Sequence, residues 1–184
     1  DLKFADVNND GKITPADRTM IGDPTPNVTY GFSLGVDYKN WSFGIDMMGQ
    51  GGNQIFRTWD NYNFAQFNYL AQRMDRWHGE GTSNSQPLLN SKHSINTLNS
   101  EYYIEDGKFF RIRNVQLAYS FDKSLLAKIR LQALKVYVNI QNLKTWKHNT
   151  GYTPELGGTA TAFGVDNGSY PVPAVYTFGI NLTF

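Results

Sequence analysis

The 184-residue sequence contains no cysteine, so it can hold no disulfide framework, no thiolate zinc site and no cysteine nucleophile. It also lacks any apolar run approaching the roughly 18 to 20 residues that a membrane-crossing helix needs. Neither sign of charge is in excess, because 17 basic residues stand against 16 acidic ones. The basic residues are scattered rather than gathered on one face, so we expect no nucleic-acid partner. A membrane role would therefore require β-strands.

Aromatic residues and glycine are abundant instead. Phe, Trp and Tyr make up 15% of the chain, which also has 17 glycines and a mean hydropathy of -0.47. Aromatic residues favour strands and also collect at membrane interfaces. The composition therefore indicates a β protein, either soluble or embedded in a membrane.

Five segments alternate apolar and polar residues with a period of two, which is the pattern of a strand with one apolar face. They cover residues 30–39, 41–47, 114–121, 134–141 and 176–184. Their polar phase consists mainly of Gly, Ser, Asn, Gln and Thr, as expected for a face that lines a polar lumen. Residues 123–130 could form a helical turn between the third and fourth segments.

The connections between these segments alternate in length. Residues 39–40 and 122–132 are short connections, whereas residues 50–108 and 144–174 are long and rich in Asn, Gly, Ser and Thr. An antiparallel meander places successive connections at opposite ends, so the short turns gather at one end and the long loops at the other, as in bacterial outer-membrane barrels. Residues 1–27 would lie at the long-loop end. We therefore predict an all-β chain, an antiparallel meander that forms part of a transmembrane β-barrel with long extracellular loops.

Residues 6–17 follow the spacing of an EF-hand calcium loop. The candidate ligands are Asp6, Asn8, Asp10, the Lys12 carbonyl, Thr14 and Asp17, and Gly11 stands at the sharp turn. Calcium takes about six to eight hard oxygen ligands, and the three carboxylates would neutralise its charge. Asp17 replaces the usual Glu, whose longer side chain reaches more easily for bidentate binding. We expect a structural calcium ion that stiffens an external loop; an Asx-rich turn that binds nothing is the simpler alternative.

Other chemistry is sparse in the sequence. The three histidines, His78, His93 and His148, lie in loop-like sequence outside any recognisable motif, so we predict that the chain is not an enzyme. Aromatic residues of the first long loop are candidates for stacking on a sugar or for contacting a partner, with packing in the loop's own small core as the alternative. The candidates are Trp59, Tyr62 and Phe64.

Arg111 and Arg113 share the alternating phase of Val115 near the long-loop end. This phase predicts a contact with lipid at the membrane interface, and a local salt bridge is the alternative.

A series of short strings carries a family resemblance along nearly the whole chain. The strings are Asp6–Asp17 with Ile21–Pro26, Tyr30–Phe32, Arg76–Trp77, Tyr103–Asn114, Val136–Leu143, Gly151–Glu155, and Tyr170–Pro173 with Tyr176–Phe184. In order and spacing they resemble the SusC/RagA-like TonB-dependent transporters of Bacteroidetes outer membranes. The chain departs from the usual pattern at Thr153, where Asp is common, and at Ala174, where Arg is common.

The resemblance implies a barrel of about twenty-two strands, blocked by an N-terminal plug, of which this chain supplies the last five or so strands. Residues 1–27 would be an extracellular loop with the EF-hand-like motif, and residues 28–184 the C-terminal strands and loops. The implied function is import of oligosaccharides or peptides across the bacterial outer membrane. The implied partners are a SusD-like surface lipoprotein, TonB through the absent N-terminal region, outer-membrane lipid, and a glycan or peptide substrate.

A soluble calcium-binding β-domain for adhesion or carbohydrate binding is the alternative, since sandwich strands alternate too. The surroundings of the apolar phase separate the two. A barrel would expose this phase on one continuous surface, and a sandwich would bury it against a second sheet. The residues that decide are Phe32, Phe43, Leu117, Val138 and Ile180.

Overall fold

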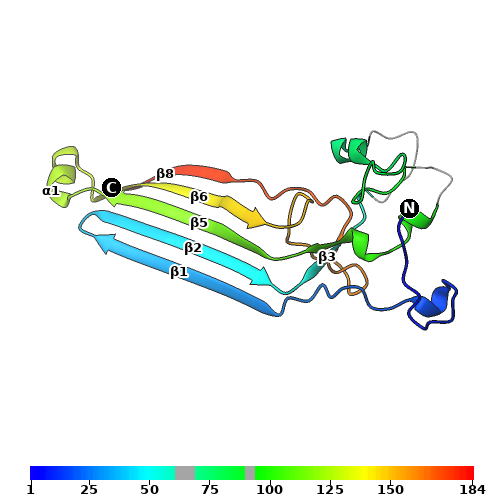
Figure 1. Ribbon diagram of the computed structural model, residues 1–184. Helices are drawn as coiled ribbons and strands as arrows, with labels where there is room; N and C mark the ends of the chain where they lie inside the picture. The colour runs from blue at the N-terminus through cyan, green and yellow to red at the C-terminus, as the bar shows by residue number, and fades with distance from the viewer. Residues whose placement is uncertain (61–68, 90–93) are drawn as a thin grey trace.

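The computed structural model describes residues 1–60, 69–89 and 94–184, and its main feature is a five-stranded antiparallel sheet (Figure 1). In sheet order the strands are β1 (Val28–Tyr38), β2 (Trp41–Gly51), β5 (Phe109–Ser120), β6 (Ala133–Lys147) and β8 (Val175–Thr183). The sheet order follows the chain order, which confirms the predicted antiparallel meander. Several strands extend beyond the predicted segments, most of all β5 at its start and β6 at its end.

The two ends of the sheet differ as the connection lengths predict. Lys39 and Asn40 alone join β1 to β2, and Lys39 adopts a left-handed backbone with φ of 53°. The β5–β6 connection at the same end contains the short helix α1 (Lys123–Leu126) and the 3₁₀ turn η5 (Ala127–Ile129). Figure 1 shows the C-terminus at this short-turn end, and the N-terminus with the long connections at the opposite, long-loop end.

A second, smaller sheet lies at the long-loop end, with strand order β4-β3-β7. It contains β3 (Gln54–Arg57), β4 (Ile104–Asp106) and β7 (Val165–Asp166). Strand β3 pairs antiparallel with β4 and parallel with β7. The sequence did not predict these strands, because segments of two to four residues are too short to display alternation.

The remaining elements are four 3₁₀ turns, also outside the five-stranded sheet, among the described residues. They are η1 (Pro15–Asp17), η2 (Ala71–Asp75), η3 (Ser94–Thr97) and η4 (Glu101–Tyr103). The most buried large apolar side chains, Ile55 and Tyr103, belong to β3 and η4 and so lie at the long-loop end. Among the described residues, no helix combines the length and the apolar character that crossing a membrane would need.

The register of the large sheet shifts at one level, in β2, β5 and β6. In the β2–β5 pairing, Arg113 is an extra residue of β5 opposite the step from Asp46 to Met47. In the β5–β6 pairing, Arg113 stands opposite two residues of β6, Asn142 and Leu143. A bulge of this kind adds an unpaired residue, so the side chains before it change face relative to those after it. Arg111 therefore does not share the face of Val115, which corrects the phase expected from simple alternation.

Candidate functional site

One face of the five-stranded sheet is apolar from edge to edge. The register aligns its side chains in cross-strand rows, one of which runs through Val36, Phe43, Leu117, Val138 and Phe178. Phe178 is 79% exposed, and no described element packs on this face. A sandwich would have buried these side chains, so the fold that the soluble alternative requires is not formed by the described residues.

Aromatic side chains border this apolar face at the long-loop end. The rings of Tyr30 and Phe110 stack with centroids 6.4 Å apart, and Phe110 stacks with Trp146 at 5.6 Å. Tyr30 and Phe110 belong to strands that are not neighbours, and Gly49 of β2 lies between them in the register. Because Gly49 has no side chain, the Tyr30 ring can lie across β2. We call Tyr30, Phe110 and Trp146 the loop-end aromatic row.

A matching set borders the short-turn end. Trp41 and Tyr119 have ring centroids 4.8 Å apart, and Tyr119 meets Phe121 edge to face at 5.0 Å. With Tyr38, which pairs with Trp41 in the register, these residues form the turn-end aromatic row. From Trp41, in the turn-end row, to Gly49, at the level of the loop-end row, β2 spans about 27 Å at roughly 3.4 Å per residue. A strand tilt of roughly 35 to 45° reduces this to about 19 to 22 Å across a membrane, close to the apolar band of outer-membrane barrels.

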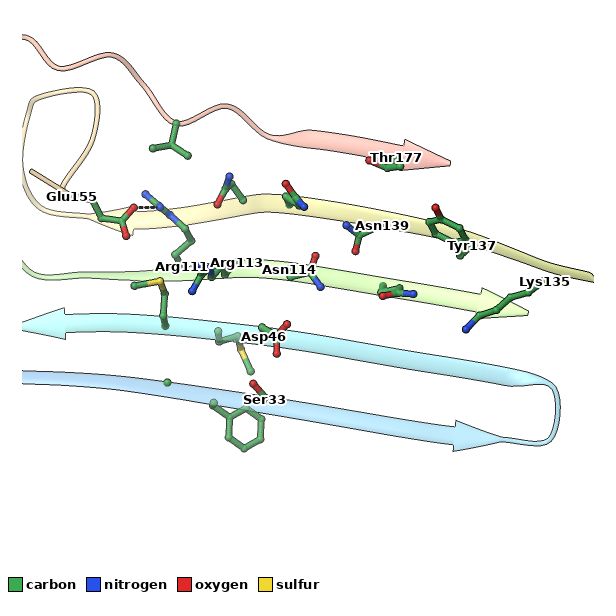
Figure 2. Close-up of a pocket in the computed structure, with 18 of the residues that line it drawn as sticks. Ser33, Asp46, Arg111, Arg113, Asn114, Lys135, Tyr137, Asn139, Glu155 and Thr177 are labelled. Carbon is green, nitrogen blue, oxygen red and sulfur yellow. Dashed lines mark hydrogen bonds and ion pairs between the residues drawn. The ribbon is translucent and has the colours of Figure 1, made fainter. Parts of the chain in front are cut away.

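The opposite face of the sheet is polar and hollowed. It lines a trough of about 1310 Å³ (Figure 2). The charged residues that line the trough are Asp46, Arg111, Arg113, Lys135 and Glu155. Arg111 is 4% exposed; its guanidinium pairs with Glu155 and donates from Nε to Thr145 Oγ1 at 2.7 Å. The bulge thus directs Arg111 and Arg113 to the polar face, and the predicted lipid contact of these two residues is wrong.

The small sheet is organised around Arg57. Its Nε donates to Asp60 Oδ1 at 2.8 Å and its Nη1 to Glu105 Oε1 at 2.7 Å. Burial works against the charged guanidinium, but the carboxylates of Asp60 and Glu105 outweigh it and raise the pKa of Arg57. The centroids of three aromatic rings lie 5.6 to 5.8 Å from the guanidinium carbon of Arg57; the rings are those of Trp59, Tyr102 and Tyr103. We call these six residues the Arg57 cluster.

The cluster fastens several loops together. Arg73 donates to the Asp60 carbonyl at 3.0 Å, and Thr150 donates from its backbone N–H to Glu105 Oε2 at 2.9 Å. Burial raises the pKa of the Tyr103 hydroxyl, which donates to the Asn96 carbonyl. The long loops therefore share one polar and aromatic core at the end of the sheet.

In the calcium-like loop, the carboxylates bind the loop's own backbone. Asp6 accepts from Asp10 N–H at 3.2 Å and from Gly11 N–H at 2.8 Å. Asp17 accepts from Thr14 N–H at 2.7 Å and from Val7 N–H at 2.9 Å. The Thr14 bond is the main cause that lowers the pKa of Asp17, and the Val7 bond adds to it.

The donor set fits calcium in chemical type, because it consists of carboxylate, amide, hydroxyl and carbonyl oxygens. Within the residues that the structure describes, no three Asp, Glu, His or Cys side chains gather closely enough to hold a metal ion. Binding would therefore require these side chains to move closer to a common centre.

Comparison with known proteins extends over almost the entire chain. No protein-family model matches it. It is 32% identical to the TonB-dependent receptor P3 of Formosa agariphila over 195 residues, which cover 98% of this chain and 19% of the relative. It is 23% identical to the TonB-dependent receptor SusC of Bacteroides thetaiotaomicron, over 98% of this chain and 17% of SusC. The chain thus spans about a fifth of the length of these relatives.

A solved structure decides the fold family. The chain is similar to the RagAB peptide importer in the 'closed-closed' state, with a TM-score of 0.77 and 26% identity over 94% of this chain and 19% of that one. In sequence and fold, it is a SusC/RagA-type segment. The segment's matched relatives are named receptors and importers, which agrees with the prediction that it is not an enzyme.

Of the three aromatic ligand candidates in the first long loop of this SusC/RagA-type segment, only Trp59 lies within the described residues. Trp59 packs on Arg57, and its indole Nε1 is buried without a hydrogen-bond partner among the described residues. This placement matches packing in the loop's own core. Tyr62 and Phe64 lie outside the described residues, and a ligand contact by any of the three stays a prediction.

Proposed function

We propose that the protein to which this segment belongs is a TonB-dependent transporter of the bacterial outer membrane. It would import an oligosaccharide or a peptide together with a SusD-like surface lipoprotein. The observation that carries the proposal is the apolar face of the large sheet, exposed between two aromatic rows and backed by a polar trough.

Lipid is the environment that suits this face. Phe32, Phe178 and Ile180 are 55%, 79% and 66% exposed. Leaving such side chains in water forgoes about 1.5 to 3 kcal/mol for each one that could be fully buried. A bilayer removes this cost, and the aromatic rows would lie at its two interfaces.

The two edges of the sheet support a larger barrel. Strands β1 and β8 each pair with only one neighbour in this sheet, so each leaves a row of backbone N–H and C=O groups without a sheet partner. Such groups must be paired inside a bilayer, and barrel closure is the arrangement that pairs them. The polar trough would then face the lumen, along the route of a hydrophilic substrate.

The partners and the substrate class that we propose are inferred from the relatives. TonB dependence is part of the names of the matched receptors, and the RagAB structure is described as a peptide importer. TonB would bind a region outside this chain, and the SusD-like lipoprotein would cover the long loops, which we place outside the cell. A glycan or a peptide is the substrate class we propose.

Fractionation and uptake in the native host test this function. The full-length protein should appear in the outer-membrane fraction, and uptake of its substrate should stop when TonB is removed while surface binding persists. Fluorescent peptides and oligosaccharides compared side by side would identify the class. Recovery in the soluble fraction, or uptake that is independent of TonB, would refute the proposal.

We also propose that residues 6–17 bind calcium. The support is the ligand spacing and the oxygen donors, with Asp6 already held at the turn where Gly11 has φ of 80°. Calorimetry of the full-length protein should show calcium uptake that Asp10→Ala removes. Asp75→Ala, which removes an exposed carboxylate elsewhere at the long-loop end, is the matched control. Heat of binding that is unchanged by Asp10→Ala contradicts a site in this loop.

A further inference from the structure

The β5–β6 connection carries an exposed apolar pair at the short-turn end. Leu125 is 54% exposed and Ile129 is 63% exposed. They are four residues apart on the α1–η5 segment, so they share one side of it. Leu126, by contrast, is only 2% exposed and fixes the segment to the protein. The segment is therefore folded while it presents two large aliphatic side chains outward.

Basic residues flank this pair along the β5–β6 connection, and one more stands in the β1–β2 turn at the same end. Lys39, Lys123, Lys128 and Arg130 are all exposed, and none of them is in an ion pair within the described ranges. Asp122 is the one acidic residue of the two short connections, and it accepts a hydrogen bond from Asn40 Nδ2 at 2.8 Å. The short-turn end therefore presents unpaired positive charge beside exposed apolar surface.

This charge is continuous with the proposed membrane surface. Phe121, the last member of the turn-end aromatic row, directly precedes Asp122, and the Asn40–Asp122 bond joins the hairpin to the β5–β6 connection. Figure 1 shows both connections at the same end of the sheet. An aromatic row lies at the level of lipid headgroups, so the residues just beyond it reach the phosphates.

We propose that the short-turn end binds anionic phospholipids of the adjacent leaflet. Leu125 and Ile129 insert between the lipids beside the turn-end aromatic row. The basic side chains contact the headgroup phosphates; they are Lys39, Lys123, Lys128 and Arg130. This inference rests on the proposed function, since it requires the sheet to lie in a bilayer. An anionic lipid fits better than an acidic protein partner, because the apolar pair continues a surface that already faces lipid.

Depth measurements separate this proposal from the proposed function. The segment has no cysteine, so nitroxide labels can be placed by single substitutions in a cysteine-free full-length protein reconstituted in phosphatidylglycerol-containing bilayers. Phe43→Cys reports the apolar face, Ile129→Cys reports the turn, and Met74→Cys, at a 77% exposed position of the long-loop end, reports water. Accessibility to oxygen and to a water-soluble nickel complex gives the depth of each label.

We expect the labels at positions 43 and 129 both to favour oxygen, more strongly at 43. A water-like label at 43 would refute the barrel itself. A lipid-like label at 43 with a label at 129 as water-exposed as that at 74 would overturn the present inference alone.

Lipid retention tests the charges. Native mass spectrometry of the detergent-purified protein should show phosphatidylglycerol retained in preference to phosphatidylcholine. Each basic residue near an anionic surface contributes roughly fivefold in binding at low salt, so Lys128→Gln with Arg130→Gln should lower retention by about 30-fold. Lys3→Gln with Arg18→Gln removes the same charge at the long-loop end and should leave retention unchanged. Equal losses in the two double variants would overturn the assignment.

Discussion

Tyr30 and Phe110 stack across an intervening strand, with ring planes 14° apart, because Gly49 leaves the space between them open. A Cβ at position 49 would collide with the Tyr30 ring and lie 2.6 Å from the Phe109 carbonyl oxygen. The loop-end aromatic row therefore depends on the absence of a side chain at position 49.

We predict that Gly49→Val lowers the thermal stability of the full-length protein in detergent. Overpacking of this kind costs about 1 to 3 kcal/mol. Gly44→Ala on the same strand is the control, because no atom lies within 4 Å of its added Cβ. Equal melting temperatures for Gly49→Val and the wild type would show that the row can rearrange freely.

The two faces of β5 predict opposite responses to a charge. Val115→Arg would place a guanidinium near the middle of the apolar face, where a charge costs about 2 to 4 kcal/mol in a barrel. Gln116→Arg places the same group in the polar trough and should be tolerated. Folded protein in the outer membrane, measured by heat-modifiable migration on gels, should fall for the first variant only. Comparable yields of the two variants would contradict the assignment of the faces.

The bulge at Arg113 predicts which positions water can reach. Arg113→Cys should react with a membrane-impermeant maleimide, since the trough would open to water, whereas Val115→Cys should be protected by lipid. Labelling in intact outer membranes, read by mass shift, provides the comparison. The uninterrupted alternation that the sequence suggested would instead place both positions on one face and give them equal reactivity.

We predict that the long loops lose stability when Arg57 is removed. Arg57→Ala leaves the largely buried carboxylates of Asp60 and Glu105 without their cation, and breaking a buried ion pair in this way costs about 3 to 5 kcal/mol. Limited proteolysis should therefore cut the loops faster while the strands remain intact. Arg18→Ala, at an exposed position of the same end, should have the wild-type cleavage rate. If the Arg57→Ala protein is not cleaved, the aromatic rings of the cluster are sufficient to hold the long loops together.

Asp17 predicts an acid limit for the calcium-like loop. Backbone N–H groups lower the pKa of the Asp17 carboxyl below the ordinary value of 3.8. The contribution of this carboxylate to the stability of the loop is therefore complete above that value and is lost as the pH falls through the lowered pKa. Exchange protection of the Thr14 amide, corrected for the intrinsic rate, should persist near pH 4 and decline below it. Asp17→Ala should remove this protection at every pH, and protection that survives the substitution would refute the role of the carboxylate.

Sequence patterns predicted the large sheet because each of its strands has one apolar face, and alternation records that face directly. The bulge was not predictable, since Arg113 changes the phase without any change in composition. Arg57 gave no signal either, because its distant partner Glu105 is brought beside it only by the pairing of β3 with β4, which are strands of four and three residues. The calcium-like loop was visible as a spacing, but the hydrogen bonds of its carboxylates depend on coordinates.

The parallel pairing of β3 with β7 has a consequence for the order of folding. Thr58 donates from its hydroxyl to the Asp166 carbonyl at 2.9 Å, across 108 residues of chain. Closing so long a loop costs entropy that local hairpins avoid, so contacts of this kind form late. The small sheet should therefore assemble only after β5 and β6 have shortened the path between its strands. A protease pulse during refolding should then find the long loops open while the hairpins are already protected.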